Sequence, residues 1–140
     1  MCRPPYLPVT LMVLISFASQ GFSAPPTVDP SVFEVRSSGW WKEADHGGTY
    51  RVVVRHGGFE HINTSVQLEW LMQANAATNQ HVVHSALLLD TLLGAVTIKS
   101  MERTEDGVKL VLGGPMDQGP DYYCEVALQP GGKYTKVAGC

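Results

Sequence analysis

Five histidines are the residues of this sequence best suited to metal chemistry. Imidazole nitrogens bind zinc and copper, and three of them around one ion would form an open catalytic or transport site. His56 and His61 flank a Gly-Gly pair, and a two-residue turn there would place both on one face of a hairpin. The histidines that would complete a set of three are His46, His81 and His84. The sequence has no His-Glu-x-x-His motif, so we expect no metal or cofactor and treat His56, His61 and His84 as the candidates to test.

Covalent catalysis has no matching motif in this chain. The sequence lacks Gly-x-Ser-x-Gly, and its glycine pairs stand between predicted strands rather than before a helix, where a phosphate-binding loop needs them. Glu34, Glu60 and Glu69 fall in predicted strands without a partner that would indicate a catalytic carboxylate pair. We therefore expect a protein that is not an enzyme.

Aromatic side chains are the strongest indication of a binding surface. Adjacent side chains of an extended chain point to opposite faces, so Trp40 and Trp41 cannot both enter one core. One tryptophan is then expected in the core and the other over an edge or a groove, and exposed tryptophans often mark binding surfaces. The predicted binding residues are Trp40, Trp41, Phe59 and Tyr123.

The first 23 residues have the features of a secretory signal peptide. A basic residue precedes an apolar run over residues 11–18, which is too short to span a bilayer, and small residues follow it. The small-x-small pattern predicts cleavage after Ser23. The remaining chain carries Cys124 and Cys140, and an even number of cysteines in an oxidising compartment predicts one disulfide. We expect a secreted or periplasmic protein with no stable membrane insertion after cleavage.

The charge balance excludes one class of partner. The formal net charge is −3, from 13 acidic and 10 basic residues without long runs of either sign. Binding to nucleic acid or to an anionic membrane surface requires concentrated positive charge, which this chain lacks. We therefore expect no nucleic-acid partner, and 140 residues suffice for one domain with a core.

Strand patterns extend over the rest of the chain. Residues 66–72 alternate apolar and polar side chains with Leu71 as the exception, which predicts a half-buried strand with Trp70 as the core anchor. Residues 81–93 fit either a fully buried strand ending near Leu89 or a short helix, and the β-rich context on both sides favours the strand.

Two predicted hairpins have registers that a structure can test. With residues 57–58 as a two-residue turn, Arg55 faces Glu60 as a cross-strand ion pair. A three-residue loop over residues 131–133 would place the two cysteines of the last two strands directly opposite each other, which predicts a cross-strand disulfide.

These observations predict an all-β, single-domain chain of seven or eight short strands. An extended Pro-rich leader at 24–31 precedes an antiparallel, immunoglobulin-like β-sandwich at 32–140, with a small β-barrel as the alternative. A β scaffold with exposed aromatics is typical of binding platforms. The predicted function is an exported binding or assembly module of the cell envelope or extracellular space, with a protein or glycan partner. The alternatives are a small inhibitor of a secreted hydrolase, acting through a loop at 56–59 or 113–120, and a histidine-based metal-binding protein.

Overall fold

The computed structural model describes residues 28–73 and 80–140 of the chain. These residues form eight strands, and they contain no helix long and apolar enough to cross a membrane. In chain order the strands are β1 (Val32–Glu43), β2 (His46–Gly57), β3 (Asn63–Gln73), β4 (Gln80–Leu93), β5 (Thr97–Arg103), β6 (Val108–Gly114), β7 (Tyr122–Gln129) and β8 (Lys133–Ala138). The predicted signal peptide, with its cleavage site after Ser23, lies outside the described residues.

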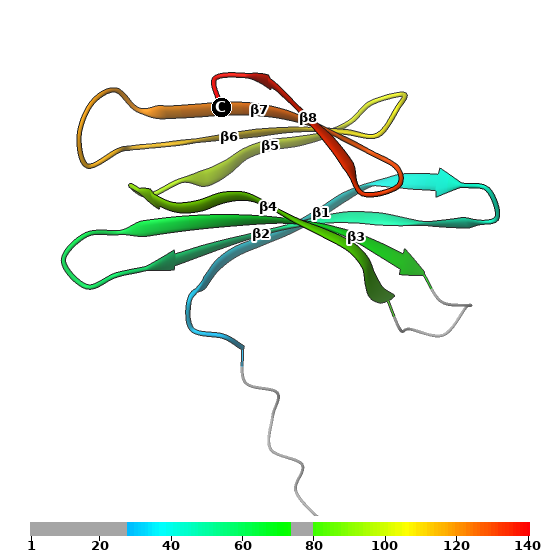
Figure 1. Cartoon of the computed structure of the whole chain (residues 1–140), viewed down its shortest axis with the longest axis horizontal. Helices are drawn as coiled ribbons and strands as arrows, with labels where there is room; N and C mark the ends of the chain where they lie inside the picture. Colours follow the sequence, from blue (N-terminus) through cyan, green and yellow to red (C-terminus); the bar gives the residue numbers. More distant parts are fainter. Residues whose placement is uncertain (1–27, 74–79) are drawn as a thin grey trace, which may run out of the picture.

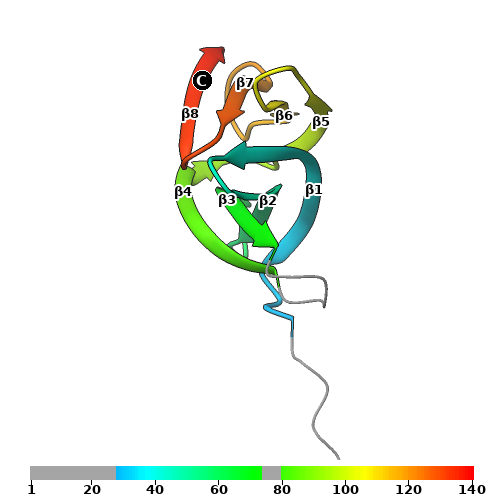
Figure 2. The ribbon, with the colours of Figure 1, turned by 90° about the vertical axis from the view of Figure 1, so that its right-hand side faces the viewer.

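The strands form two antiparallel sheets, ordered β1-β2-β3-β4 and β5-β6-β7-β8, which lie as two layers (Figure 1). The first sheet curves so that β1 runs beside β5 (Figure 2). At this side the Glu34 carboxylate accepts a hydrogen bond from the backbone N–H of Ile98, with a donor–acceptor distance of 2.9 Å. The prediction of an all-β chain with two antiparallel sheets is confirmed.

The order of strands differs from that of an immunoglobulin domain. In that fold, Greek-key connections combine strands from different parts of the sequence in each sheet. Here all hydrogen-bonded neighbours are consecutive, and the chain passes between the sheets once, from β4 to β5. The immunoglobulin-like type is therefore not confirmed, because the spacing of strands along a sequence does not distinguish a meander from a Greek key. The two sheets are also separate, unlike the single closed sheet of the alternative barrel.

Alternating side chains of the central strands build one core between the sheets. Its largest fully buried members are Trp70, Tyr50, Leu68, Leu110, Leu112, Leu128, Val52, Val54, Val66, Val96, Val108 and Val126. The indole N–H of Trp70 donates a 2.6 Å hydrogen bond to the backbone carbonyl of Gln129 in the other sheet. Trp70 is thus confirmed as the core anchor, and it also links the two layers.

The apolar segment at residues 81–93 is a strand, as predicted, but it is not buried as predicted. β4 continues past the expected end at Leu89 to Leu93. It is an edge strand that pairs only with β3, and Leu88 is its one buried side chain, while Val82 and Leu87 are exposed. The prediction of a fully buried strand is wrong, because an apolar run does not tell whether a strand lies at the centre or at the edge of a sheet.

The β2–β3 hairpin has a different register from the predicted one. The connection is a five-residue loop at 58–62, and Val54 faces Val66. Arg55 therefore faces a serine of β3, and the predicted Arg55–Glu60 pair is wrong. The two-residue turn would have placed a histidine opposite Val54, whereas the observed register aligns the inward apolar residues of both strands.

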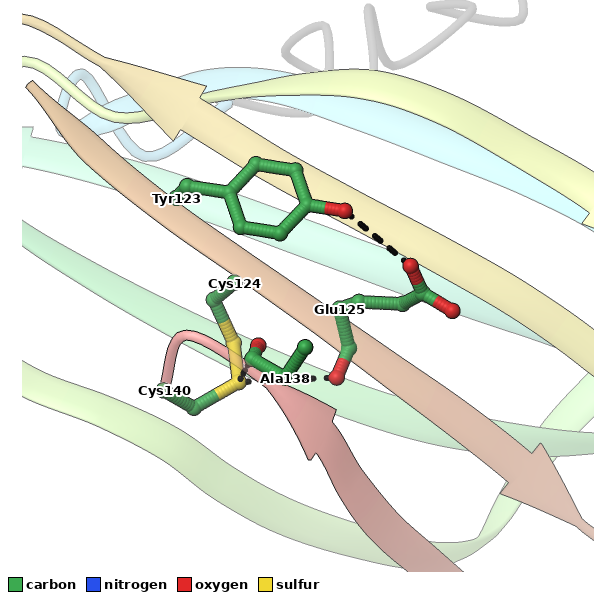
Figure 3. Close-up of a disulfide and its surroundings, with 5 residues drawn as sticks. All are labelled: Tyr123, Cys124, Glu125, Ala138 and Cys140. Atoms are coloured by element: carbon green, nitrogen blue, oxygen red, sulfur yellow. Dashed lines mark hydrogen bonds between the residues drawn. A yellow bond between two sulfur atoms is a disulfide. The ribbon is translucent and has the colours of Figure 1, made fainter.

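Cys124 and Cys140 form the predicted disulfide, with their Cα atoms 4.5 Å apart (Figure 3). The β7–β8 loop has the expected odd length of three residues but comprises residues 130–132 instead of 131–133. An irregularity beside Glu125 then shifts the pairing by one residue toward the predicted register. This shift recovers one of the two positions by which the displaced loop offsets the pairing, so the two cysteines are bonded without being the directly opposite pair that the sequence predicted.

The β1–β2 turn contains a strained alanine. Ala44 has a φ of 50°, in the left-handed region where the Cβ of an L-residue is crowded. We expect Ala44→Gly to raise the free energy of unfolding by roughly 0.5–1 kcal/mol, because the relief of strain exceeds the entropy that glycine adds to the unfolded chain. Urea denaturation measures this change. Ala127→Gly, within β7, is the control and is expected to lower stability; an equal loss for both variants would contradict the prediction.

Candidate functional site

Trp40 lies in a bulge of β1, directly before Trp41. Ser38 pairs with Tyr50 and Trp41 pairs with Gly48, so β1 contains one residue more than β2 over this stretch. Gly39 accommodates the bulge with a φ of 69°, and a Cβ at this position would overlap the side chain of Val108. The bulge thus packs β1 closely against the second sheet and sets the directions of the two tryptophans.

The two indoles have different environments, as the extended-chain argument predicted. Trp41 is buried, with 4% of its surface exposed, and its N–H donates to the Thr49 carbonyl at 3.2 Å. Trp40 is 46% exposed. Its ring lies against Gly47 of β2, where a Cβ would stand only 3.3 Å from the Trp40 Cζ2 and Nε1 atoms. The glycine therefore makes room on β2 for the edge of the indole that carries Cζ2 and Nε1.

A groove of about 580 Å³ adjoins Trp40 at the end of the sandwich that lies on the right of Figure 1. We call it the Trp40 groove. Its walls come from the end of β1 and from the β5–β6 and β7–β8 turns, so both sheets contribute. The lining residues are Trp40, Trp41, Lys42, Glu43, Arg103, Glu105, Asp106, Gly107, Gln129, Pro130 and Lys133.

The charges in the Trp40 groove balance. Three cationic and three anionic side chains line it, namely Lys42, Arg103, Lys133, Glu43, Glu105 and Asp106. Among the described residues, none of these six takes part in an ion pair within 4 Å. Their charged groups are therefore available to a ligand, and the groove as a whole favours neither anions nor cations.

The sequence pattern indicates the tryptophans of this groove but not its charged residues. Residues 104–107, which end in the Asp-Gly pair typical of a hairpin turn, connect β5 to β6. No sequence signal connects this turn to Trp40, because the contact arises from the packing of one sheet on the other.

Phe59 lies at the opposite end of the molecule, on the left of Figure 1, in the β2–β3 loop. Its side chain is fully exposed. A second cavity of about 670 Å³ at this end is lined by residues of this loop, of the end of β4 and of the β6–β7 loop. His61 Nδ1 and Asp117 Oδ2 are 3.1 Å apart and connect the two loops. Phe59 therefore does not share a surface with Trp40.

Tyr123 occupies a third position, on β7 beside the disulfide and outside both cavities (Figure 3). Its hydroxyl donates to the Glu125 carboxylate at 3.0 Å, and Lys109 Nζ lies 3.0 Å from the other oxygen of that carboxylate. The hydrogen bond from Lys109, followed by the one from Tyr123, lowers the pKa of Glu125. The hydrogen bond to Glu125 raises the pKa of Tyr123. The four predicted binding residues thus fall in three places.

The structure does not bring the candidate histidines together. No group of three His, Cys, Asp or Glu residues in 28–73 and 80–140 is arranged to hold a metal ion. His56 Nε2 lies 2.9 Å from the Val96 carbonyl oxygen, and the His84 ring packs edge-on against Trp70. The prediction that His56 and His61 share one face of a hairpin is wrong, because His61 lies in the longer loop.

Tyr50 carries a buried hydroxyl for which the described residues offer no hydrogen-bond partner. Burial raises the pKa of Tyr50 from 10.0 to about 12. Between these values the unfolded chain ionises its tyrosine while the folded chain retains the proton, so stability falls as pH rises. We expect Tyr50→Phe to leave the free energy of unfolding unchanged or raise it by up to about 1 kcal/mol at neutral pH, and to weaken the alkaline decline.

Urea denaturation at neutral pH and at several values between pH 10 and 12 tests this expectation. Tyr122→Phe is the matched control, because the Tyr122 hydroxyl is also buried without a partner and burial also raises its pKa. A marked loss of stability in Tyr50→Phe at neutral pH would show that the hydroxyl is satisfied.

Comparisons with known proteins identify no relative of this chain. No family model matches the sequence, and neither a curated protein nor a solved structure matches the chain.

Proposed function

We propose that the chain is an exported, non-enzymatic binding module, secreted or periplasmic, that holds its partner in the Trp40 groove. The exposed indole of Trp40, packed over Gly47, is the observation that supports this proposal most directly. An aromatic ring already held in place provides a large contact area while losing little side-chain freedom on binding.

The remainder of the groove fits a binding role better than a catalytic one. Its lining contains no serine, cysteine or histidine and therefore lacks a Ser–His or Cys–His pair for covalent catalysis, while its titratable side chains are carboxylates, lysines and an arginine. The groove is built on strand ends and short turns of a two-layer scaffold, which positions side chains rigidly. The Cys124–Cys140 disulfide is compatible with an oxidising compartment, in agreement with the proposed export.

Site-specific photo-crosslinking tests this function. A photoreactive amino acid replaces Lys42, an exposed residue of the groove, and the protein is irradiated in the exported fraction of its source. We expect a discrete adduct that disappears when Trp40→Ala is added. The same amino acid at Lys99, which is exposed and outside the groove, is the control. Equal crosslinking at both positions would contradict a partner in the groove.

One observation favours the hydrolase inhibitor as a second candidate. The two loops nominated for insertion into an active site meet through His61 and Asp117, and Phe59 projects fully from the first of them. A protruding aromatic on a braced loop is a suitable anchor for an enzyme cleft. Stoichiometric inhibition in a panel of secreted hydrolases, lost in Phe59→Ala and retained in Trp40→Ala, would establish this function in place of the groove.

A further inference from the structure

Trp40 contributes a partly exposed aromatic ring to the lining of the groove. Gly47 lies against the indole, and nearly half of the side chain remains exposed. The N–H groups of Trp41 and Trp70 donate to backbone carbonyls, whereas that of Trp40 has no acceptor within the described part of the chain. The edge of the ring with Cζ2 and Nε1 lies against β2, and the exposed remainder provides an apolar surface.

The walls beside this ring are polar. Carboxylates of Glu43, Glu105 and Asp106 accept hydrogen bonds, and Lys42, Arg103 and Lys133 donate them. Gln129 does both. Because the charges balance, this lining suits a neutral ligand with many hydroxyl groups. A peptide anchored by an apolar side chain would need an apolar pocket, and a nucleic acid would need an excess of positive charge.

From this combination we infer that the occupant of the Trp40 groove is a neutral oligosaccharide, with one pyranose ring stacked on Trp40. A pyranose with equatorial hydroxyls has a flat face of polarised C–H groups, which is attracted to the negative face of an indole. Its hydroxyls lie around the rim, where the carboxylates, the cations and Gln129 can bond to them. This inference rests on the proposed function, since it names the ligand of the same groove.

Isothermal titration calorimetry with cellotetraose, chitotetraose and maltotetraose tests the inference on the folded protein. We expect saturable binding of at least one tetrasaccharide at millimolar concentration or below. Trp40→Ala should weaken it about tenfold or more, and Trp40→Phe, which keeps a smaller aromatic face, should weaken it less. Phe59→Ala removes a more exposed aromatic at the other end and should leave the affinity unchanged.

The thermal unfolding midpoint of each variant shows whether it has folded, and Trp40→Phe serves if Trp40→Ala does not fold. No binding of any of the three sugars at millimolar concentration overturns the inference, as does binding that Trp40→Ala leaves intact. A productive, Trp40-dependent crosslink at position 42 together with absent sugar binding would overturn the glycan alone and leave the binding function standing.

Discussion

Replacement of both Cys124 and Cys140 by alanine is expected to lower the free energy of unfolding by about 3 kcal/mol. The disulfide closes a loop with a sequence separation of 16, which restricts the unfolded chain. It also fastens β8, an edge strand whose side chains are exposed from residue 135 onward. With so little buried surface, β8 depends on its backbone hydrogen bonds to β7 and on this cross-link.

Urea denaturation of oxidised wild type, Cys140→Ala and the double variant separates the cross-link from side-chain packing. Cys124 is fully buried, whereas Cys140 is exposed. Cys140→Ala breaks the bond and leaves the Cys124 side chain in the core, so it should already show most of the loss. Hydrogen exchange should show faster exchange in β8 than in β6 in both variants. A loss below about 1 kcal/mol would mean that β8 is held by its hydrogen bonds alone.

The strands were predictable because alternating side chains report burial directly. In β3, Thr64, Val66, Leu68 and Trp70 face the core, and the sequence pattern contains the last three. The pairing registers were harder to predict, because they depend on which apolar residues of two strands face each other. The five-residue β2–β3 loop follows from the match of Val54 with Val66 and not from the glycine pair that suggested a tighter turn.

For the candidate site, too, the sequence predicted the properties of neighbouring residues but not the contacts between distant ones. Neighbouring residues of a strand point in opposite directions, so the sequence predicts one buried and one exposed tryptophan, and the bulge at Gly39 makes Trp41 the buried one. Most of the groove's other lining residues come from the β5–β6 and β7–β8 turns, which are distant from Trp40 in the sequence. Their proximity depends on the bulge at Gly39 and on the packing of the β5–β6 and β7–β8 turns beside β1. No pattern within one strand encodes that arrangement.

Trp70→Ala is expected to lower the free energy of unfolding by about 3–5 kcal/mol, the largest effect of any single substitution considered for this chain. The side chain is fully buried, and its ring packs edge-on against Tyr50 with centroids 6.2 Å apart. Its truncation leaves a cavity between the sheets, and the Gln129 carbonyl loses its donor. Trp70→Phe retains most of the apolar volume, so its smaller loss should isolate the cost of the missing hydrogen bond.

Trp40→Ala is the matched control for Trp70→Ala, because the same truncation at a half-exposed ring over Gly47 should cost far less stability. Trp70→Ala should therefore show the larger loss of stability in urea denaturation, and Trp40→Ala should show the larger loss of ligand affinity. Trp70→Phe tests whether the core affects the groove. Gln129 accepts the Trp70 hydrogen bond through its backbone carbonyl and also lines the groove. If the folded Trp70→Phe variant binds ligand more weakly than wild type, Trp70 also positions the wall of the groove. Unchanged affinity would show that Trp70 stabilises the core without affecting ligand binding.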